Sequence, residues 1–322
     1  MALHAKRDKH SLIGTEKRSA GRRSESHRSP SGSFVWGGIA VDSCDNRGPT
    51  GALETGNVGV TEMTAERLSI RELDSICTEF EKSWQPDREL VRLVEFASRR
   101  VSPDSISFKE LLLDLSLIDL EKRWAYRSDR LNLACRRGVR KDRIDLSTPP
   151  DFQTYLQLLA PNDASPEDRL TLAQAELNAR WTFGDVPEIE EFITAVPGVK
   201  RPEVPPPTVQ LVMSGQIVFE TDLIGTMHIG RQARGESPPF TVAFAATKKL
   251  ICSELMDAST SRKQLELRPI ARHLVLLYNG SENRSLVYAE GRDLEPKESR
   301  IVSFAQPLQI PLKHLTIVIS RS

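Results

Sequence analysis

Three short groups of residues in the last third of the sequence carry side chains that could bind a ligand. Gly230-Arg231 follows an apolar run, Ser261-Arg262-Lys263-Gln264 comes some thirty residues later, and Asn279 to Ser285 follows. An arginine offers a planar fork of donors, a serine offers a hydroxyl, and an asparagine offers both a donor and an acceptor. Taken singly, such residues are usually solvated loop positions, so any inference depends on their order and spacing.

Residues that typically build metal sites or nucleophilic centres do not group in this way. The cysteines are widely spaced with no Cys-x-x-Cys pair, so we expect reduced thiols and no zinc site. The histidines at 228, 273 and 314 lack ligand-like spacing and are expected on strands or at the surface. There is no nucleophile elbow and no P-loop motif. We therefore expect no enzymatic activity, no metal and no cofactor.

Charge along the chain bears on the kind of partner. Lysine and arginine total 44 and aspartate and glutamate total 44, so neither nucleic acid nor an anionic membrane is an expected partner of the whole molecule. Residues 1–62 are rich in Ser, Gly, Arg and Lys without an apolar period, which predicts a disordered basic arm. A contact of this arm with nucleic acid or an acidic surface is the alternative. Met63 opens the first periodic segment and is an alternative start of translation.

Hydropathy predicts the cellular location. The sequence contains no run of about 18 apolar residues and no apolar stretch after its basic N-terminal residues. We therefore expect neither a membrane span nor a secretory signal, and we expect the protein in the cytoplasm.

The pattern over residues 63–197 predicts a helical domain. We expect a helix start at Thr64-Ala65-Glu66-Arg67 and the strongest apolar stripe from Phe108 to Trp124. A long loop is expected from Arg127 to Thr148. Ser165-Pro166-Glu167-Asp168 supplies a cap, a first-turn proline and acids that suit the helix dipole, so another helix is expected to begin there.

An internal repeat lies within this helical segment. Asp119 to Tyr126 matches Glu176 to Phe183, and each unit carries an Arg-Trp pair. We expect the tryptophans in a core and the arginines snorkelling or paired with acids. Residues 73–198 resemble the helical region that precedes the kinase domain in some bacterial serine/threonine kinases, although the kinase motifs themselves are missing.

The character of the chain changes after residue 197. Residues 198–208 contain three consecutive prolines and predict a semi-rigid linker. Beyond it the apolar period becomes two, in short runs separated by turn residues, which predicts an antiparallel β-sandwich over 209–322. The chain is thus expected to be an α+β multidomain protein with a disordered arm, a small all-α repeat domain and a sandwich. The expected strands are 209–213, 217–219, 224–229, 249–252, 264–267, 274–278, 286–288, 300–304 and 315–319.

The motifs of the sandwich region resemble the forkhead-associated (FHA) family. That family's pattern is Gly-Arg, then Ser-Arg-x-His, then Ser-x-Asn-Gly-Thr, then Asn-Gly. Here Gly230-Arg231, Ser261-Arg262-Lys263-Gln264 and Ser281-Glu282-Asn283-Arg284-Ser285 follow in that order within Val209 to Ile319. The resemblance implies an antiparallel sandwich whose loops at one end bind phosphothreonine peptides.

The same resemblance assigns residues to the site. The implied phosphopeptide-binding residues are Gly230, Arg231, Ser261, Arg262, Glu282 and Asn283, with Gln264 as loop support in place of the family's His. A phosphothreonine carries about −1.5 to −2 charges and three strong acceptors, which a guanidinium fork and a hydroxyl can meet.

Further roles follow from the same match. Asn283 would hold the peptide main chain, and Gly230 would let the loop turn tightly beside Arg231. Glu282 would bring a carboxylate toward the phosphate.

Two functions are consistent with these features. The first is a phosphothreonine-dependent adaptor in serine/threonine kinase signalling in a bacterium, whose partner is a phosphothreonine-containing kinase or kinase substrate. The alternative is a non-catalytic scaffold whose sandwich binds partners without reading phosphate. A Glu282 carboxylate in the same pocket as Arg231 and Ser261 would favour the scaffold. A fragment of an enzyme would require a convergent set of titratable groups, and the sequence contains none.

Overall fold

The computed structural model describes residues 67–321 except 140, 160–163, 245–246, 283–286, 290 and 313, and the side chains of 287–289 are not described either. The arm expected at 1–62, the alternative start at Met63 and the site residue Asn283 all lie outside the described residues.

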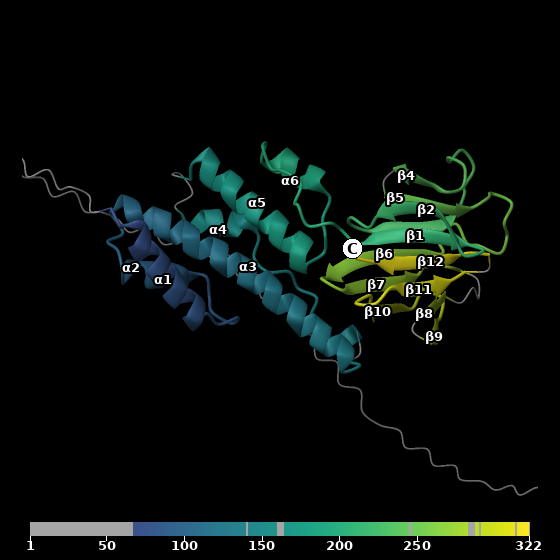
Figure 1. Ribbon diagram of the computed structural model, residues 1–322, viewed down its shortest axis with the longest axis horizontal. Helices are drawn as coiled ribbons and strands as arrows, with labels where there is room; N and C mark the ends of the chain where they lie inside the picture. Colours follow the sequence, from purple (N-terminus) through teal and green to yellow (C-terminus); the bar gives the residue numbers. More distant parts are fainter. Residues whose placement is uncertain are drawn as a thin grey trace, which may run out of the picture. The chain divides into compact units, whose positions relative to one another are not determined.

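Helices occupy the first part of the described chain and strands occupy the second (Figure 1). The helices are α1 (Ile70–Ser83), α2 (Val91–Ser98), α3 (Ile106–Arg136), the 3-10 turn η1 (Lys141–Arg143), α4 (Phe152–Leu158), α5 (Pro166–Phe183) and α6 (Ile189–Ala195).

Two helices begin with a capping box, in which a serine and an acid satisfy two backbone N–H groups reciprocally. In α5 the Ser165 side chain accepts from the Asp168 N–H at 3.1 Å while the Asp168 carboxylate accepts from the Ser165 N–H at 2.8 Å, so the predicted start is confirmed. In α1 the same box is formed by Ser69 and Glu72. The start expected at residues 64–67 was therefore placed too early, because the capping side chain is Ser69.

Helix α3 continues well into the region expected to be a loop. It ends at Arg136, and the predicted loop from Arg127 to Thr148 is therefore wrong over its first ten residues. The sequence after Arg127 is mostly polar, which is typical of a loop. Arg127, Ser128 and Leu131 are nevertheless buried on this helix. Their burial against the sandwich, described below, supplies the tertiary contacts that stabilise the added turns.

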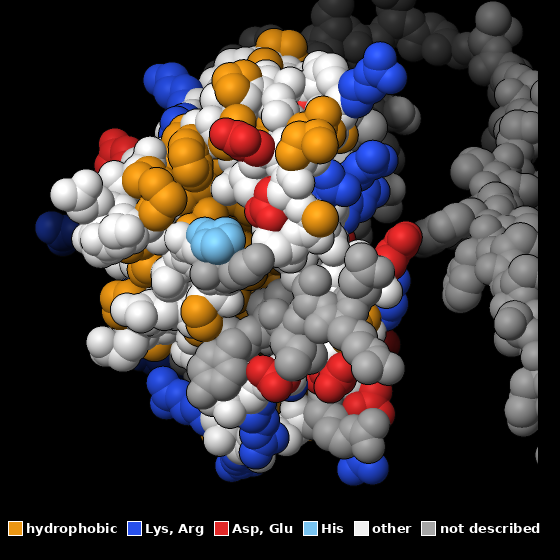
Figure 2. All heavy atoms as spheres, turned by 90° about the vertical axis from the view of Figure 1, so that its right-hand side faces the viewer, with side chains coloured by type: hydrophobic (Ala, Val, Ile, Leu, Met, Phe, Trp, Pro, Cys, Tyr) orange, Lys and Arg blue, Asp and Glu red, His pale blue; other side chains and the backbone are white. Residues whose placement is uncertain are grey.

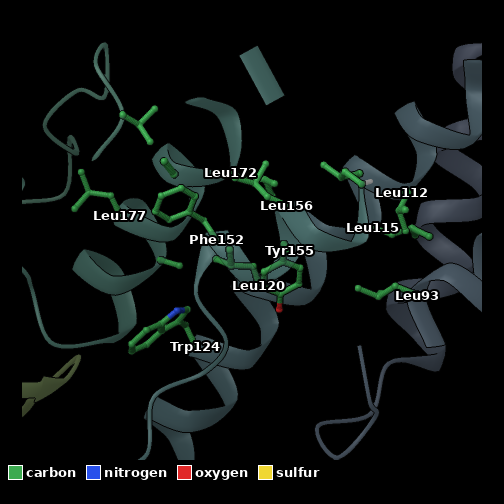
Figure 3. Packing of buried hydrophobic residues seen from close by; sticks show 14 of the residues in the cluster. Leu93, Leu112, Leu115, Leu120, Trp124, Phe152, Tyr155, Leu156, Leu172 and Leu177 are labelled. Atoms are coloured by element: carbon green, nitrogen blue, oxygen red, sulfur yellow. The ribbon is translucent and has the colours of Figure 1, made fainter. Parts of the chain in front are cut away.

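The helices share one hydrophobic core. Figure 3 shows Phe152, Tyr155 and Leu156 of α4 among the leucines of α3 and α5. Each of these three side chains is at most 7% exposed, so the short helix α4 is held by its packing.

Each repeat unit buries its tryptophan and pairs its arginine with an acid. Trp124 and Trp181 are each 1% exposed. Arg123 Nε lies 2.6 Å from the Asp119 carboxylate, and the repeat-related Arg180 Nη1 lies 3.3 Å from that of Glu176. The expectation of core tryptophans and acid-paired arginines is confirmed in both units.

The strands form two large sheets and one small one. The strands are β1 (Thr208–Met213), β2 (Gln216–Asp222), β3 (Met227–Arg231), β4 (Thr241–Phe244), β5 (Lys248–Ser253), β6 (Leu265–Ala271), β7 (Leu274–Asn279), β8 (Val287–Ala289), β9 (Arg292–Leu294), β10 (Ser299–Ser303), β11 (Leu308–Pro311) and β12 (Thr316–Ser320). One sheet has the order β11-β12-β1-β2, the second has the order β10-β7-β6-β3-β5-β4, and β8 pairs with β9.

The main β core consists of buried side chains from both large sheets. Val209, Leu211, Ile317 and Ile319 from one sheet share a cluster with residues of the other, including Ile229, and all five are fully buried. The sandwich is thus built on the alternation that the sequence showed.

The sandwich is mixed rather than antiparallel, which corrects the expectation. Strands β3 and β5 pair in parallel, from Met227↔Lys248 to Arg231↔Ser253. After β3 the chain forms the edge strand β4 and then β5, which lies between β3 and β4 in the sheet. Strand β5 is therefore antiparallel to β4 and parallel to β3. Strands β4, β9 and β11 were not predicted.

The helical segment and the sandwich are joined by side chains. Leu131 of α3 forms a small buried cluster with Ile270, Leu274 and Ile301 of the sandwich. Arg127 Nη1 donates to the Ile270 carbonyl at 2.6 Å. Burial lowers the pKa of Arg127, with neighbouring charges acting in both directions.

The segment expected to be a linker is bound to α5. The Lys200 N–H donates to the Gln174 side chain at 2.7 Å, and the same side chain donates to the Lys200 carbonyl at 3.0 Å. The assignment of 198–208 as a boundary between independent domains stays a prediction.

Candidate functional site

Several loops meet at one end of the sandwich because of how its strands run. The parallel strands β3 and β5 both finish there, at Arg231 and Ser253, and the antiparallel β6 begins there at Leu265. Strand β7 also ends there, at Asn279, paired with the start of β6. Figure 2 looks onto this end, where Lys and Arg side chains lie beside Asp, Glu and hydrophobic ones.

A basic hollow of about 600 Å³ lies among these loops. Among the described residues, the charged and hydroxyl-bearing side chains that line this basic hollow are Arg231, Thr260, Ser261, Arg262, Lys263, Glu282 and Lys297. Four of the six predicted binding residues, Arg231, Ser261, Arg262 and Glu282, therefore come together. Four cations face a single carboxylate in this lining, so the hollow favours an anion.

Arg231 is fixed at the end of β3. Its Nη1 donates to the Leu255 carbonyl, and its backbone N–H donates to the Ser261 carbonyl at 3.0 Å. Its Nε is buried and has no hydrogen-bond partner among the described residues. A guanidinium held in this way presents its remaining donors without needing to be ordered by a ligand.

Gly230 contributes differently from what was expected. It lies within β3 and its φ is not positive, so it does not form a tight turn. A Cβ at this position would overlap the carbonyl oxygen of Arg262 and would lie 2.8 Å from that of Ser261. Glycine is required here because the loop carrying Ser261 and Arg262 passes directly over the strand.

Gln264 is bonded to the loop that carries Ser261. The side chain is 3% exposed, and its Oε1 accepts from the Ser261 N–H at 3.0 Å. Its backbone is held as well, since its N–H donates to Ile229 at 2.8 Å and its carbonyl accepts from Gly280 at 3.2 Å. An amide can therefore buttress this loop where the family carries an imidazole.

Two acids close to the basic hollow are already engaged. Burial acts to raise the pKa of Asp257, but hydrogen bonds from Ser259 and Thr260 outweigh it and leave the pKa below its usual range. Burial likewise acts to raise the pKa of Glu236, while a hydrogen bond from Lys249 and other contacts lower it overall. These carboxylates order the surrounding loops, and Glu282 is the carboxylate that faces the hollow.

Lys263 and Lys297 were missed in the sequence. Lys297 lies on the turn between β9 and β10, with φ at 65°, and its N–H donates to the Asn279 carbonyl at 2.8 Å. Asn279 is fully buried and also donates to Leu294 at 2.7 Å. Only the pairing of β10 with β7 brings this turn to the hollow, so local sequence carried little signal.

Of the neighbouring residues Glu282 and Asn283, the structure describes only Glu282. Glu282 is exposed and lines the basic hollow together with Arg231 and Ser261. That position is the one expected to favour a scaffold. Asn283 lies outside the described residues, so its predicted contact with a peptide main chain stays a prediction.

Several solved structures that are similar to this chain are FHA domains. The FHA domain of the CT664 protein from Chlamydia trachomatis is 18% identical, and the match covers 36% of this chain and 97% of that one with a TM-score of 0.26. The N-terminal FHA domain of Rad53p from S. cerevisiae, solved in complex with a phosphothreonine peptide, is 13% identical, with 36% and 94% coverage and a TM-score of 0.25. The MEK1 FHA domain is 12% identical, with 36% and 90% coverage and a TM-score of 0.26.

The family expected from the motifs is the family of these solved structures. No protein-family model matches the chain, and no curated protein matches it significantly.

Among the described residues no group of three or more His, Cys, Asp or Glu side chains is arranged to hold a metal ion. Within the same part of the chain no helix is long and apolar enough to cross a membrane.

Proposed function

We propose that the sandwich binds a phosphothreonine-containing segment of a partner protein in the basic hollow. The observation that carries this proposal is the convergence of Arg231, Arg262, Lys263 and Lys297 on one hollow together with the hydroxyl of Ser261. A phosphate of about −1.5 to −2 charges matches four cations far better than a neutral threonine does. Each charge-assisted hydrogen bond contributes roughly 1.5–3 kcal/mol, and a few of them suit a micromolar, reversible contact.

The proposed partner is a serine/threonine kinase or a kinase substrate, and the chain acts as a non-catalytic adaptor. This part rests on the resemblance of residues 73–198 to a region that precedes bacterial kinase domains. The helices would then act as a spacer or a second docking surface.

The decisive experiment compares matched phosphothreonine and threonine peptides by fluorescence anisotropy with the full chain. We expect measurable affinity for the phosphothreonine peptide and none for the threonine peptide. Arg231→Ala should weaken that affinity by at least about tenfold, because one charged hydrogen-bonding partner is removed. Arg234→Ala is the matched control, since Arg234 is exposed on the next loop and does not line the basic hollow.

The second candidate is the scaffold, which the position of Glu282 in the basic hollow favours. A carboxylate there opposes a phosphate, although it is outnumbered by the cations. Equal binding of both peptides, with no effect of Arg231→Ala, would reject phosphate reading and leave the scaffold.

A further inference from the structure

A hollow larger than the basic hollow lies in the helical segment. Its volume is about 900 Å³, and it shares no lining residue with the basic hollow. Its floor is one face of α5 between residues 170 and 183, and one of its sides is formed by residues 198–204. The other side is formed by three residues of α3, which are Leu117, Ile118 and Glu121. We call this hollow the α3–α5 groove, and at 1.5 Å per helical residue its floor is roughly 20 Å long.

Helices α3 and α5 lie side by side and run in the same direction (Figure 1). Near their starts, Lys109 Nζ of α3 lies 2.8 Å from the Asp168 carboxylate of α5. Further along, the Arg180 guanidinium of α5 lies 5.7 Å from the centroid of the Trp124 ring of α3. The α3–α5 groove therefore follows two parallel helices.

Helix α3 carries more apolar side chains than the helical core covers. Its leucines and isoleucines lie on every side of the helix, and Leu117 and Ile118 are only partly buried against the core. Leu170 and Phe183 of α5 are likewise only partly buried. These four side chains line the groove together with the small side chain of Ala175. Contiguous apolar surface of this kind is typical of a site that binds another protein.

The lining of the groove offers few hydrogen-bond partners to the backbone of a ligand. The peptide groups of α3 and α5 bond within their own helices. On the side formed by residues 198–204, the Gln174 side chain takes both the N–H of Lys200, at 2.7 Å, and its carbonyl, at 3.0 Å. A helix arrives with its own peptide groups satisfied, whereas an extended segment does not. The groove therefore favours a helical ligand.

The unpaired charges that line the groove are mostly acidic. Glu121 and Glu203 are exposed and have no ion-pair partner among the described residues. Arg201 is paired with Asp222 at 2.7 Å, which leaves Lys200 as the cation without an acid in the described lining. Two acids against one cation favour a ligand with a net positive charge.

We propose that the α3–α5 groove docks a basic amphipathic helix of a partner protein, which lies along α5. The helix buries apolar side chains spaced at i, i+4 and i+7 against Leu117, Ile118 and Phe183. Its Lys or Arg side chains lie toward Glu121 and Glu203. This contact involves no phosphate, so it gives the helical segment a binding role of its own and does not depend on phosphothreonine binding by the sandwich.

The test selects binders from a phage-displayed library of peptides of about 14 residues, long enough to follow the floor of the groove as a helix, with the full chain as the target. We expect enriched peptides to carry a net positive charge and apolar residues spaced by three and four positions. Synthetic copies should gain helical circular dichroism when they bind.

Ala175→Arg tests whether these peptides occupy the groove. It should weaken their binding by at least about tenfold in anisotropy titrations, because the long side chain fills the groove and displaces one large apolar side chain of the ligand. Ala195→Arg is the matched control, since Ala195 is exposed on α6 and does not line the groove. Urea unfolding of both variants separates lost binding from lost folding.

A second variant tests the charges and decides the matter if Ala175→Arg is less stable than its control. Glu121→Gln/Glu203→Gln keeps the size of both side chains. It should weaken the same peptides about threefold at low salt and less at high salt, since exposed charges contribute modestly and are screened.

Three results would overturn the proposal. The first is that the library yields no enriched peptide, and the second is that enriched peptides bind Ala175→Arg as tightly as the unmodified chain. The third is that their apolar residues alternate as in an extended strand. An excess of phosphothreonine peptide should not displace the enriched peptides, and displacement would place them in the basic hollow instead. Because the library carries no phosphate, each outcome stands whether or not the sandwich reads phosphothreonine.

Discussion

At the scale of single residues, the basic hollow depends on side chains and backbone that are ordered before a ligand arrives. Arg231 is held by the Leu255 carbonyl, and Ser261 is held by Gln264. Ordering a long side chain on binding costs roughly 0.5–1.5 kcal/mol, so prior ordering preserves affinity. The other cations of the hollow, Arg262, Lys263 and Lys297, are exposed. They contribute a positive electrostatic potential more than fixed hydrogen bonds.

Replacing Glu282 by Gln tests the carboxylate that lines the basic hollow among the described residues. We expect Glu282→Gln to bind phosphothreonine peptide about 2–5-fold more tightly, because it removes an exposed like charge worth about 0.5–1 kcal/mol. The gain should shrink as salt is raised, since exposed charges are screened. Anisotropy titrations at low and high ionic strength measure both effects. Glu191→Gln on α6 is the control, and an unchanged or weaker affinity in Glu282→Gln would show that this carboxylate points away from the ligand.

Replacing Gly230 by Ala tests the close approach of loop and strand. In an open strand, alanine is the more favourable residue by about 0.5–1 kcal/mol. Here the added Cβ would overlap the Arg262 carbonyl oxygen, so we expect Gly230→Ala to be destabilising by about 1–3 kcal/mol. Urea unfolding measures the loss, and peptide titration should show weaker binding as the loop is displaced. A gain in stability would mean that the loop does not cross the strand so closely.

At the scale of elements, Asp119 connects three helical segments. The carboxylate is 1% exposed and accepts from Trp84 Nε1 at 2.7 Å, Arg123 Nε at 2.6 Å and Tyr155 Oη at 2.8 Å. One side chain of α3 thereby fixes the end of α1 and the position of α4. Glu176, its counterpart in the repeat, instead accepts from the Phe152 N–H at the start of α4.

Asp119→Asn should therefore loosen the helical segment. The amide brings an N–H₂ group toward three donors and leaves Arg123 without its charge partner, so we expect a loss of about 3–5 kcal/mol in the free energy of unfolding. Glu121→Gln, an exposed acid on the same helix, should change stability by less than about 0.5 kcal/mol. Chemical denaturation followed by tryptophan fluorescence compares the two, and equal effects would contradict the connecting role.

Elements that depend on local signals could be predicted from the sequence. Ser165 to Asp168 predicted the start of α5, and the period-two runs predicted most of the strands. The part of α3 beyond Arg127 could not be predicted, because its polar residues are helical only where the sandwich buries them. Strand β11 was missed because it is short and ends at Pro311. Lys297 was missed because strand order, which the sequence does not display, brings its turn to the basic hollow.

At the scale of the whole described chain, α3 links the helical segment to the sandwich. Leu131 is 1% exposed in a cluster with Ile270, Leu274 and Ile301, and Arg127 bonds to the Ile270 carbonyl beside it. A long helix joined in this way makes the stability of the helical segment and that of the sandwich depend on each other.

Leu131→Ala should expose that dependence. We expect a loss of about 2–5 kcal/mol, because a buried leucine is replaced by a cavity. Hydrogen exchange should speed up both in α3 after Arg127 and in β6 and β7. Leu133→Ala is the matched control, since Leu133 lies on the same helix and is 47% exposed. Faster exchange confined to α3 would show that the sandwich is stable without the helix.

The pairing of β1 with β12 also governs how the protein is made. Thr208 and Ser320, which lie opposite each other in this pair, are 112 residues apart in sequence. At a synthesis rate of about 5–20 residues per second, β1 waits on the order of 6 to 22 s on the ribosome before β12 exists, while its other neighbour β2 follows it directly. The helices are complete before that interval, so they can fold while the sheet of β1 and β2 still lacks β11 and β12.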